Sequence, residues 1–163
     1  MPESTAWDPP APTPDSPPEH GASVLAPVAI ALAASTVLTA GWGLLSGLTE
    51  RHYVLILPAI GTVISIALTS TTARRRWFPA VAALLGFAVG YLGDIAAIAL
   101  ILYRHGISLA TLGDHFLGLI RAVNDGHSAL DWTYFIATGL TAAVTTAARQ
   151  KTLAARARRT GQR

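Results

Sequence analysis

An aspartate inside an otherwise apolar stretch is the residue of this sequence best suited to chemistry. Asp94 is the only charged residue between Trp77 and Tyr103. An ionisable group within a membrane segment is costly, and such groups commonly form ion pairs, proton relays or ion pathways. At 1.5 Å per residue, Asp94 lies ~25 Å along a helix that begins at Trp77. We therefore expect an ion pair, with partners among Arg51, His52, Arg104 and His105; a proton or cation site is the alternative.

A second group of candidates consists of histidines and acids that follow this stretch. Their side chains are of the kind that bind zinc and other divalent metals, and the candidates are His115, His127, Asp114 and Asp125. No spacing of the HExxH kind occurs, and Asp114 and His115 are adjacent, so they point to different faces of a helix. The sequence therefore predicts no metal site here, and the scattered polar residues are interpreted as interfacial.

Catalytic residue sets are not found in this sequence. It contains no cysteine, which excludes disulfides, thiolate metal sites and thiol catalysis. It also shows no Ser-His-Asp arrangement, no phosphate-binding glycine loop and no paired carboxylates within the apolar stretches. Basic residues lie beside apolar stretches and are not interleaved with aromatic residues, so nucleic acid is not an expected partner. We predict that the chain is not an enzyme and needs no cofactor.

Long uncharged runs define the elements that must position Asp94. Of the 163 residues, 52% are apolar and 13% are charged, and the mean hydropathy is +0.45. A helix needs about 20 apolar residues to cross a bilayer. Four stretches approach this length, at about residues 23–45, 53–72, 77–103 and 130–148. The predicted fold is an all-α membrane protein with a four-helix transmembrane domain over residues 23–148, embedded in a lipid bilayer.

The distribution of Lys and Arg predicts the orientation, because positive residues beside membrane spans are retained in the cytoplasm. With four spans, nine Lys and Arg residues fall on the side of the loop Arg74–Arg76 and of the basic tail 149–163, and three fall on the other side. Residues 1–22 are rich in proline and acids, which predicts a disordered tail. We expect both termini in the cytoplasm, with His115 and His127 on the outer side.

The segment between the third and fourth spans has its own pattern. Apolar residues recur at intervals of three and four from Leu109 to Val123, which predicts an outer amphipathic helix. Asn124-Asp-Gly126 predicts a turn after it. Ser128 and Asp131 then have the spacing of a capping box, which predicts the start of the last helix.

Small residues mark the expected contacts between the helices. Gly43 and Gly47 form one GxxxG pair, and Gly86 and Gly90 form another. Such pairs allow close approach of helix backbones, so packing within the chain is favoured, with dimerisation as the alternative. Hydroxyl residues also recur along two helices, at Thr62, Ser65 and Thr69 and at Thr138, Thr141 and Thr145. These stripes are interpreted as packing surfaces, and a polar permeation path is the alternative.

Three stretches carry a resemblance to known proteins: Thr72-Ala-Arg-Arg-Arg-Trp77, Leu84 to Leu102, and Asp131-Trp-Thr-Tyr-Phe135. In these the chain resembles a group of uncharacterised bacterial four-helix membrane proteins of unknown function. The resemblance implies the topology and no chemistry. The Ala- and Arg-rich composition is similar to that of actinobacterial and other high-GC bacterial proteins, which implies the plasma membrane.

The sequence leaves three functions open. The first, which we favour, is a non-enzymatic accessory or scaffold subunit that binds a membrane protein or forms a homo-oligomer. The second is a small transporter or channel that uses Asp94 and the threonine stripes. The third is a holin-like protein that permeabilises the membrane.

Overall fold

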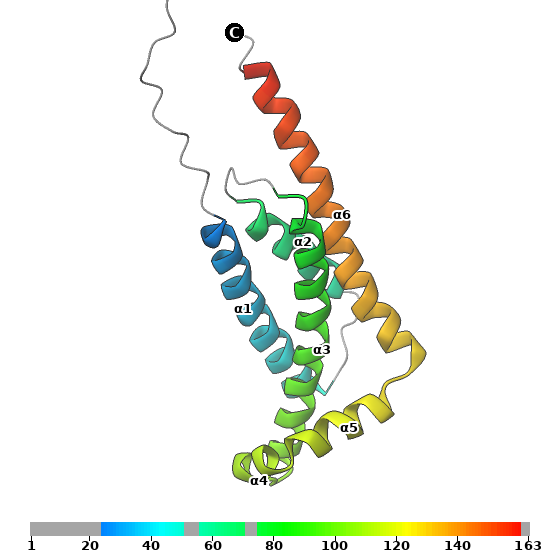
Figure 1. Cartoon of the computed structure of the whole chain (residues 1–163). Helices are drawn as coiled ribbons and strands as arrows, with labels where there is room; N and C mark the ends of the chain where they lie inside the picture. Colours follow the sequence, from blue (N-terminus) through cyan, green and yellow to red (C-terminus); the bar gives the residue numbers. More distant parts are fainter. Residues whose placement is uncertain (1–23, 51–55, 71–74, 161–163) are drawn as a thin grey trace, which may run out of the picture.

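The computed structural model describes residues 24–50, 56–70 and 75–160, and within these residues all regular structure is helical (Figure 1). The prediction of an all-α fold is therefore confirmed. The helices are α1 (Leu25–Thr49), α2 (Leu57–Leu68), α3 (Phe78–Arg104), α4 (Leu109–Asp114), α5 (Phe116–Gly126) and α6 (Ala129–Thr160). The predicted residues Arg51, His52 and residues 1–22 lie outside the described part of the chain.

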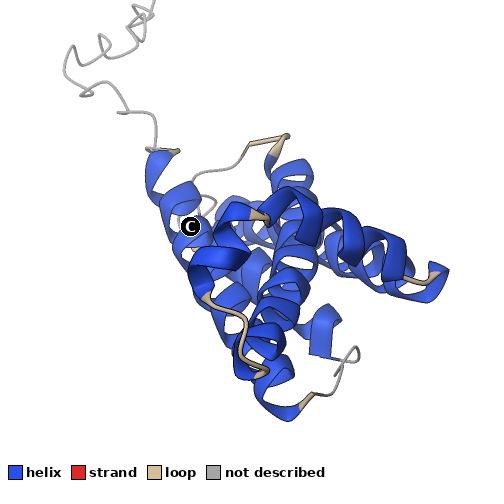
Figure 2. Cartoon of the chain, turned by 90° about the horizontal axis from the view of Figure 1, so that it is seen from below, coloured by secondary structure: helices blue, strands red, loops and turns tan. Residues whose placement is uncertain are grey.

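Helix α3 is the centre of the bundle. It packs against α1 on one side and against α6 on another, while α2 contacts α1, α3 and α6. Figure 1 shows α4 and α5 lying across the end where α3 finishes, and Figure 2 shows the helices gathered into one bundle when it is seen from that end. We call this the α5 end. The opposite end, where α3 begins and α6 finishes, is called the basic end because Arg75, Arg76, Lys151 and the other basic residues of α6 lie there.

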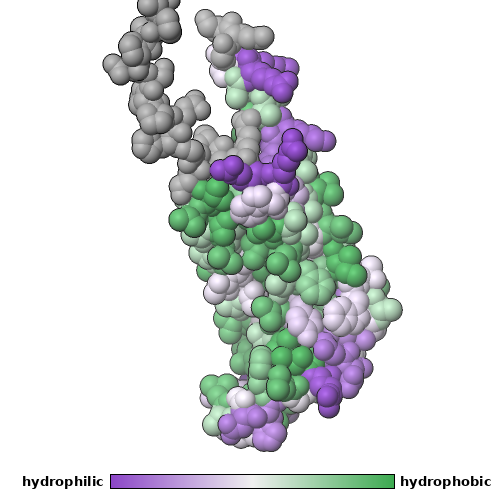
Figure 3. All heavy atoms as spheres, in the orientation of Figure 1, coloured by the Kyte–Doolittle hydropathy of each residue, from purple (hydrophilic) through white to green (hydrophobic). Residues whose placement is uncertain are grey.

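Two helices are long and apolar enough to cross a membrane, α1 with 25 residues and α3 with 27 residues. Helix α2 is apolar but has only 12 residues, so four spans remain a prediction. Many large apolar side chains are exposed, including Val37, Leu84 and Val144 at 67 to 70%. In Figure 3 hydrophobic residues cover the middle of the visible face and hydrophilic residues gather toward its two ends. A chain that exposes this much apolar surface needs a partner or a membrane to cover it.

Three of the differences from the predicted helix boundaries lie after α3. The outer amphipathic segment forms two helices instead of one, and the break lies at His115. The predicted turn at Asn124-Asp-Gly126 is wrong, because these residues complete α5 and the chain turns at His127. The last helix does not end near residue 148, since α6 continues through the basic residues to Thr160.

Glycines bring the helix backbones into close contact. All four glycines of the GxxxG pairs face neighbouring helices: a Cβ atom added at Gly43 would lie 2.8 Å from Ala96 Cβ, and one at Gly86 would lie 3.0 Å from the Thr138 carbonyl oxygen. Equivalent atoms at Gly47 and Gly90 would meet α3 and Phe135 at about 2.9 and 3.0 Å. The glycines therefore act in packing within the chain.

The closest approach to a neighbouring backbone involves glycines outside these pairs. A Cβ atom at Gly61 would lie 2.5 Å from the Thr138 carbonyl oxygen, and one at Gly139 would lie 2.7 Å from that of Ala83. Helices α2, α3 and α6 thus meet around Thr138, which is fully buried. A side chain at Gly61 cannot be accommodated by rotation of a neighbouring side chain, because the nearest atom belongs to the backbone.

Replacement of Gly61 by alanine tests this junction. We expect Gly61→Ala to lower the free energy of unfolding by ~1–3 kcal/mol, because α2 must move away from α6. The control is Gly41→Ala, since a Cβ atom there meets nothing within 4 Å, and alanine in a helix is favoured over glycine by up to ~1 kcal/mol. Unfolding by dodecyl sulfate in mixed micelles, followed by circular dichroism, measures both. Equal midpoints for the two variants would contradict the assigned junction.

Candidate functional site

Asp94 forms a buried hydrogen bond with His127, and this pair is the candidate site. Asp94 lies in α3, while His127 follows the last residue of α5 in an extended conformation. Their side chains are each 6% exposed, and His127 Nε2 lies 2.7 Å from Asp94 Oδ2. In the tautomer that carries the ring hydrogen on Nε2, this nitrogen donates and the carboxylate oxygen accepts. The pair joins the centre of the bundle to the junction between α5 and α6.

Aromatic rings surround the imidazole of His127. The ring centroids of Phe135, Trp132 and Tyr91 lie 5.2, 5.6 and 6.2 Å from its own. Phe135 and Trp132 belong to α6, and both meet the imidazole edge to face. These rings exclude water, and a hydrogen bond in such surroundings is stronger than one in solvent. The same surroundings raise the free-energy cost of removing either Asp94 or His127.

A second hydrogen bond joins the same two elements. The Tyr91 hydroxyl donates to Asn124 Oδ1 at 2.8 Å. Tyr91 precedes Asp94 by three residues, and Asn124 precedes His127 by three, so the two bonds follow one another along the contact between α3 and the end of α5. Together they fix the C-terminal end of α5 against α3.

The residues after His127 start α6 as the sequence predicts. Asp131 Oδ2 accepts hydrogen bonds from the Ser128 backbone N–H at 2.8 Å and from the Ser128 hydroxyl at 2.7 Å. The Asp131 N–H donates to Ser128 Oγ at 3.4 Å. This reciprocal arrangement is a capping box. It sets the direction in which α6 leaves His127, and so it helps to hold the imidazole toward Asp94.

The second ring nitrogen of His127 does not take part in the bond to Asp94. Its Nδ1 atom is buried and has no hydrogen-bond partner within the described part of the chain. In the neutral ring this nitrogen is an unsatisfied acceptor, and in the protonated ring it is a donor. Nδ1 is therefore a buried polar atom of the pair that is left without a hydrogen bond in the described structure. Among the described residues, no group of three or more His, Cys, Asp or Glu side chains could hold a metal ion.

The sequence identified Asp94 but not its observed partner. In the sequence, His127 is only a weak candidate metal ligand, like His115, Asp114 and Asp125. These last three residues are exposed. The sequence predicts a turn at Asn124-Asp-Gly126, whereas the chain leaves α5 at His127. The equal spacing of Asp94 to His127 and of Tyr91 to Asn124 is the only pattern that could have indicated the contact.

Two predicted partners of Asp94 make other contacts. Arg104 donates from Nη1 to the carbonyl oxygens of Gly47 at 3.3 Å and Leu48 at 3.0 Å. The same nitrogen lies 3.5 Å from Glu50 Oε1, so Arg104 binds the end of α1. His105 Nδ1 lies 2.8 Å from the Ile101 carbonyl oxygen within its own helix. Both residues therefore make their hydrogen bonds at the ends of helices.

The hydroxyl stripes do not form a row of unpaired groups. The hydroxyls of Thr62 and Thr69 donate to the carbonyl oxygens of Pro58 and Ser65, and that of Thr138 donates to the Tyr134 carbonyl oxygen. Each of these bonds is made within one turn of the same helix. The Ser65 hydroxyl is buried without a partner. This pattern favours packing surfaces, because a permeation path needs hydroxyls that face a common space.

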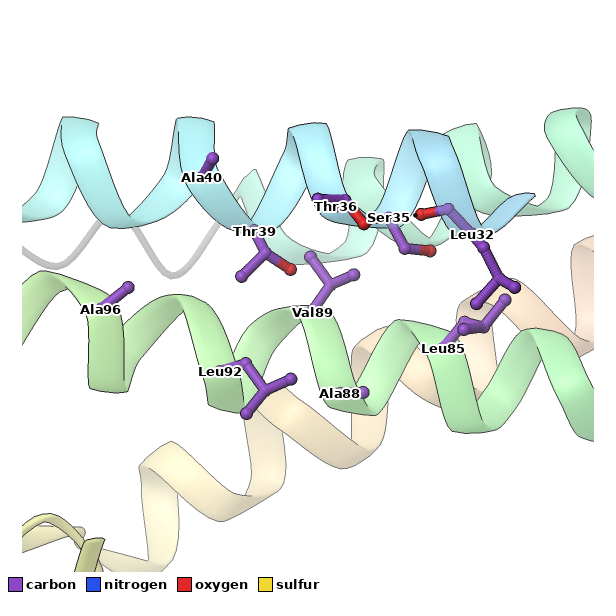
Figure 4. A pocket seen from close by; sticks show the side chains of 10 residues that line it. All are labelled: Leu32, Ser35, Thr36, Thr39, Ala40, Leu85, Ala88, Val89, Leu92 and Ala96. Carbon is purple, nitrogen blue, oxygen red and sulfur yellow. Dashed lines mark hydrogen bonds between the residues drawn. The ribbon is translucent and has the colours of Figure 1, made fainter. Parts of the chain in front are cut away.

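A groove lies on the surface between α1 and α3. Its volume is about 510 Å³, and its walls are mostly small or apolar residues: Leu32, Ser35, Thr36, Thr39, Ala40, Leu85, Ala88, Val89, Leu92 and Ala96. In Figure 4 Thr39 lies on the side of α1 that faces α3, and Val89 points back toward α1. The hydroxyl of Ser35 is buried and has no partner. The groove does not include Asp94 or His127.

Comparison of the chain with protein-family models, with characterised proteins and with solved structures gives no match.

Loss of the Asp94 carboxylate tests the buried pair. We expect Asp94→Ala to lower the free energy of unfolding by ~1–3 kcal/mol, because His127 stays buried without its partner. Asp114→Ala removes an exposed acid at the same end and should change it by less than ~0.5 kcal/mol. A double-mutant cycle with His127→Ala, measured by dodecyl sulfate unfolding, isolates the pair. Additive losses in the cycle would show that the two side chains do not interact.

Proposed function

We propose that this chain is a non-enzymatic accessory or scaffold subunit of the bacterial plasma membrane, crossing it four times with both termini in the cytoplasm. The proposal has two parts, a position in the membrane and a binding surface for another membrane helix. Different observations support each part.

The membrane position is supported by the surface and by the charges. Helices α1 and α3 have the length and composition of spans, and exposed apolar residues continue onto α6 at Leu140 and Val144. Among the described residues, Asp and Glu side chains occur only toward the α5 end, whereas Arg and Lys dominate the basic end. Positive residues are retained in the cytoplasm, so the basic end faces the cytoplasm.

The groove between α1 and α3 is the observation that carries the binding function. Between helices in a bilayer, association depends on close packing and on hydrogen bonds, and contact surfaces are rich in Gly, Ala, Ser and Thr. The groove has Ala40, Ala88 and Ala96 on its walls and the unpaired hydroxyl of Ser35 within it. An apolar helix seated there would cover the walls, and a carbonyl or hydroxyl on it would satisfy Ser35.

A proton-coupled transporter is the second candidate, and the buried pair is the observation that favours it. Acid and histidine side chains within membrane segments form proton relays in pumps and transporters. Asp94 and His127 have this composition, and Nδ1 of His127 has no partner in the described chain. Against this candidate, aromatic rings close around the imidazole, and the hydroxyls of Thr62, Thr69 and Thr138 are occupied within their own helices.

Affinity purification of the full chain in a mild uncharged detergent tests the binding function. We expect a stoichiometric membrane-protein partner or a homo-oligomer of defined size. Ala40→Phe, which fills the groove with a ring, should reduce the recovered partner at least tenfold. Ala33→Phe is the matched control, because Ala33 is exposed on the same helix and does not line the groove. A monomer that transports protons in liposomes, and loses this activity in Asp94→Asn, would contradict the proposal and support a transporter.

A further inference from the structure

A second hollow, at the basic end, has the composition of an anion site. It lies between the segment that starts α3 and the middle of α6, and its volume is about 490 Å³. The residues that line it are Arg75, Arg76, Ala147, Gln150, Lys151 and Ala154. Three of these carry a positive charge, and the two alanines leave room between α6 and the arginines. The hollow is separate from the buried pair and from the groove between α1 and α3.

Hydrogen bonds fix the backbone that carries the two arginines. Gln150 Nε2 donates to the Arg75 carbonyl oxygen at 3.2 Å, which ties this segment to α6. The backbone N–H of Phe78 donates to the same oxygen at 3.1 Å. Phe78 itself is fully buried and packs edge to face with Trp77. Arg75 and Arg76 therefore start from a fixed position beside Lys151, which reduces the entropy lost when a ligand is bound.

No acidic side chain of the described residues neutralises these charges. Their Asp and Glu residues are Glu50, Asp94, Asp114, Asp125 and Asp131, and all of them lie toward the α5 end. Three like charges around one hollow repel one another. An anion bound between them offsets this repulsion and is attracted by all three positive charges. The charge distribution therefore points to a ligand that carries at least one negative charge.

The side-chain types narrow the ligand to a phosphate group. Guanidinium groups present planar donors that match phosphate oxygens in pairs, and an ammonium group adds a compact positive charge. Trp77 directly follows Arg76 and is 44% exposed. Tryptophan is enriched at the depth of the lipid headgroups, so its position puts the hollow where the phosphates of membrane lipids lie.

We propose that this hollow binds a phosphate group whose negative charge is not neutralised by a positive group of the same ligand. Arg75, Arg76 and Lys151 supply the charge, and Gln150 holds the arginine segment in place. An anionic phospholipid at the inner leaflet is one source of the group, and a soluble phosphate ester is the other. The site depends on neither the partner helix nor the Asp94–His127 pair. Its lipid source rests on the membrane position in the proposed function, whereas the set of charges that lines the hollow does not.

Lipid binding to the purified full chain, followed by native mass spectrometry, tests the site. Phosphatidylglycerol is the anionic probe, and phosphatidylcholine, whose phosphate is covered by its choline, is the comparison. We expect wild type to retain phosphatidylglycerol at least tenfold more tightly than phosphatidylcholine. In Arg76→Gln/Lys151→Gln this affinity should fall roughly thirtyfold, since each of the two basic residues near an anionic lipid contributes ~1 kcal/mol and every ~1.4 kcal/mol is a factor of ten in affinity.

The matched control is Arg158→Gln/Arg159→Gln, which removes the same charge from the last turn of α6 and leaves the lining of the hollow unchanged. Its affinity should stay within about twofold of wild type, because Arg158 and Arg159 are not part of the site. Lys151→Gln alone, at an exposed position of α6, keeps the test valid if the double variant does not fold.

A competition experiment distinguishes the two sources of the phosphate group. Displacement of phosphatidylglycerol by millimolar inorganic phosphate would identify the phosphate group alone as sufficient, whereas retention would show that the lipid chains are needed. Both results are consistent with a phosphate site and distinguish its sources. The proposal would be overturned if Arg76→Gln/Lys151→Gln and Arg158→Gln/Arg159→Gln lost the same affinity for phosphatidylglycerol. It would also be overturned if wild type retained phosphatidylglycerol and phosphatidylcholine equally.

Discussion

Contact between helix backbones at glycine residues is the constraint on which the rest of the structure depends. In the proposed membrane setting, apolar side chains gain little by leaving lipid for another helix, so close packing has to supply the stability. Gly43 and Gly47 bring α1 onto α3, while Gly61, Gly86 and Gly139 bring α2, α3 and α6 together around Thr138. If these contacts open, the groove beside α1 and the alignment of α6 with α3 change with them.

Polar contacts between helices lie toward the ends of this packed bundle. At the α5 end, Asp94 binds His127 and Tyr91 binds Asn124. Toward the basic end, Arg149 Nε donates to Thr69 Oγ1 at 2.8 Å, and Gln150 holds Arg75. Several hydroxyls in the middle are satisfied within their own turns instead. The two ends therefore differ in chemistry, with a closed acid–histidine pair at one and an open set of cations at the other.

Sequence patterns predicted the features that repeat along the chain, and missed those that depend on one residue. Long uncharged runs indicated α1 and α3, and the spacing of Ser128 and Asp131 indicated the start of α6. Asp94 was identified because a lone acid contrasts with its surroundings. Its bond to His127 depends on where α5 ends, and local turn residues placed that end too early at Asn124. Gly61 and Gly139 form no motif, so only the assembled bundle shows what they contact.

The orientation of the bundle in a membrane is the central claim, and cysteine accessibility tests it most directly because the chain has no cysteine of its own. Single cysteines at Thr49, Ala129 and Thr160, all exposed, are treated in intact cells with an impermeant thiol reagent. Four spans with the basic end in the cytoplasm predict labelling at Thr49 and Ala129, and labelling at Thr160 only after lysis. Labelling at Thr160 in intact cells would contradict this orientation.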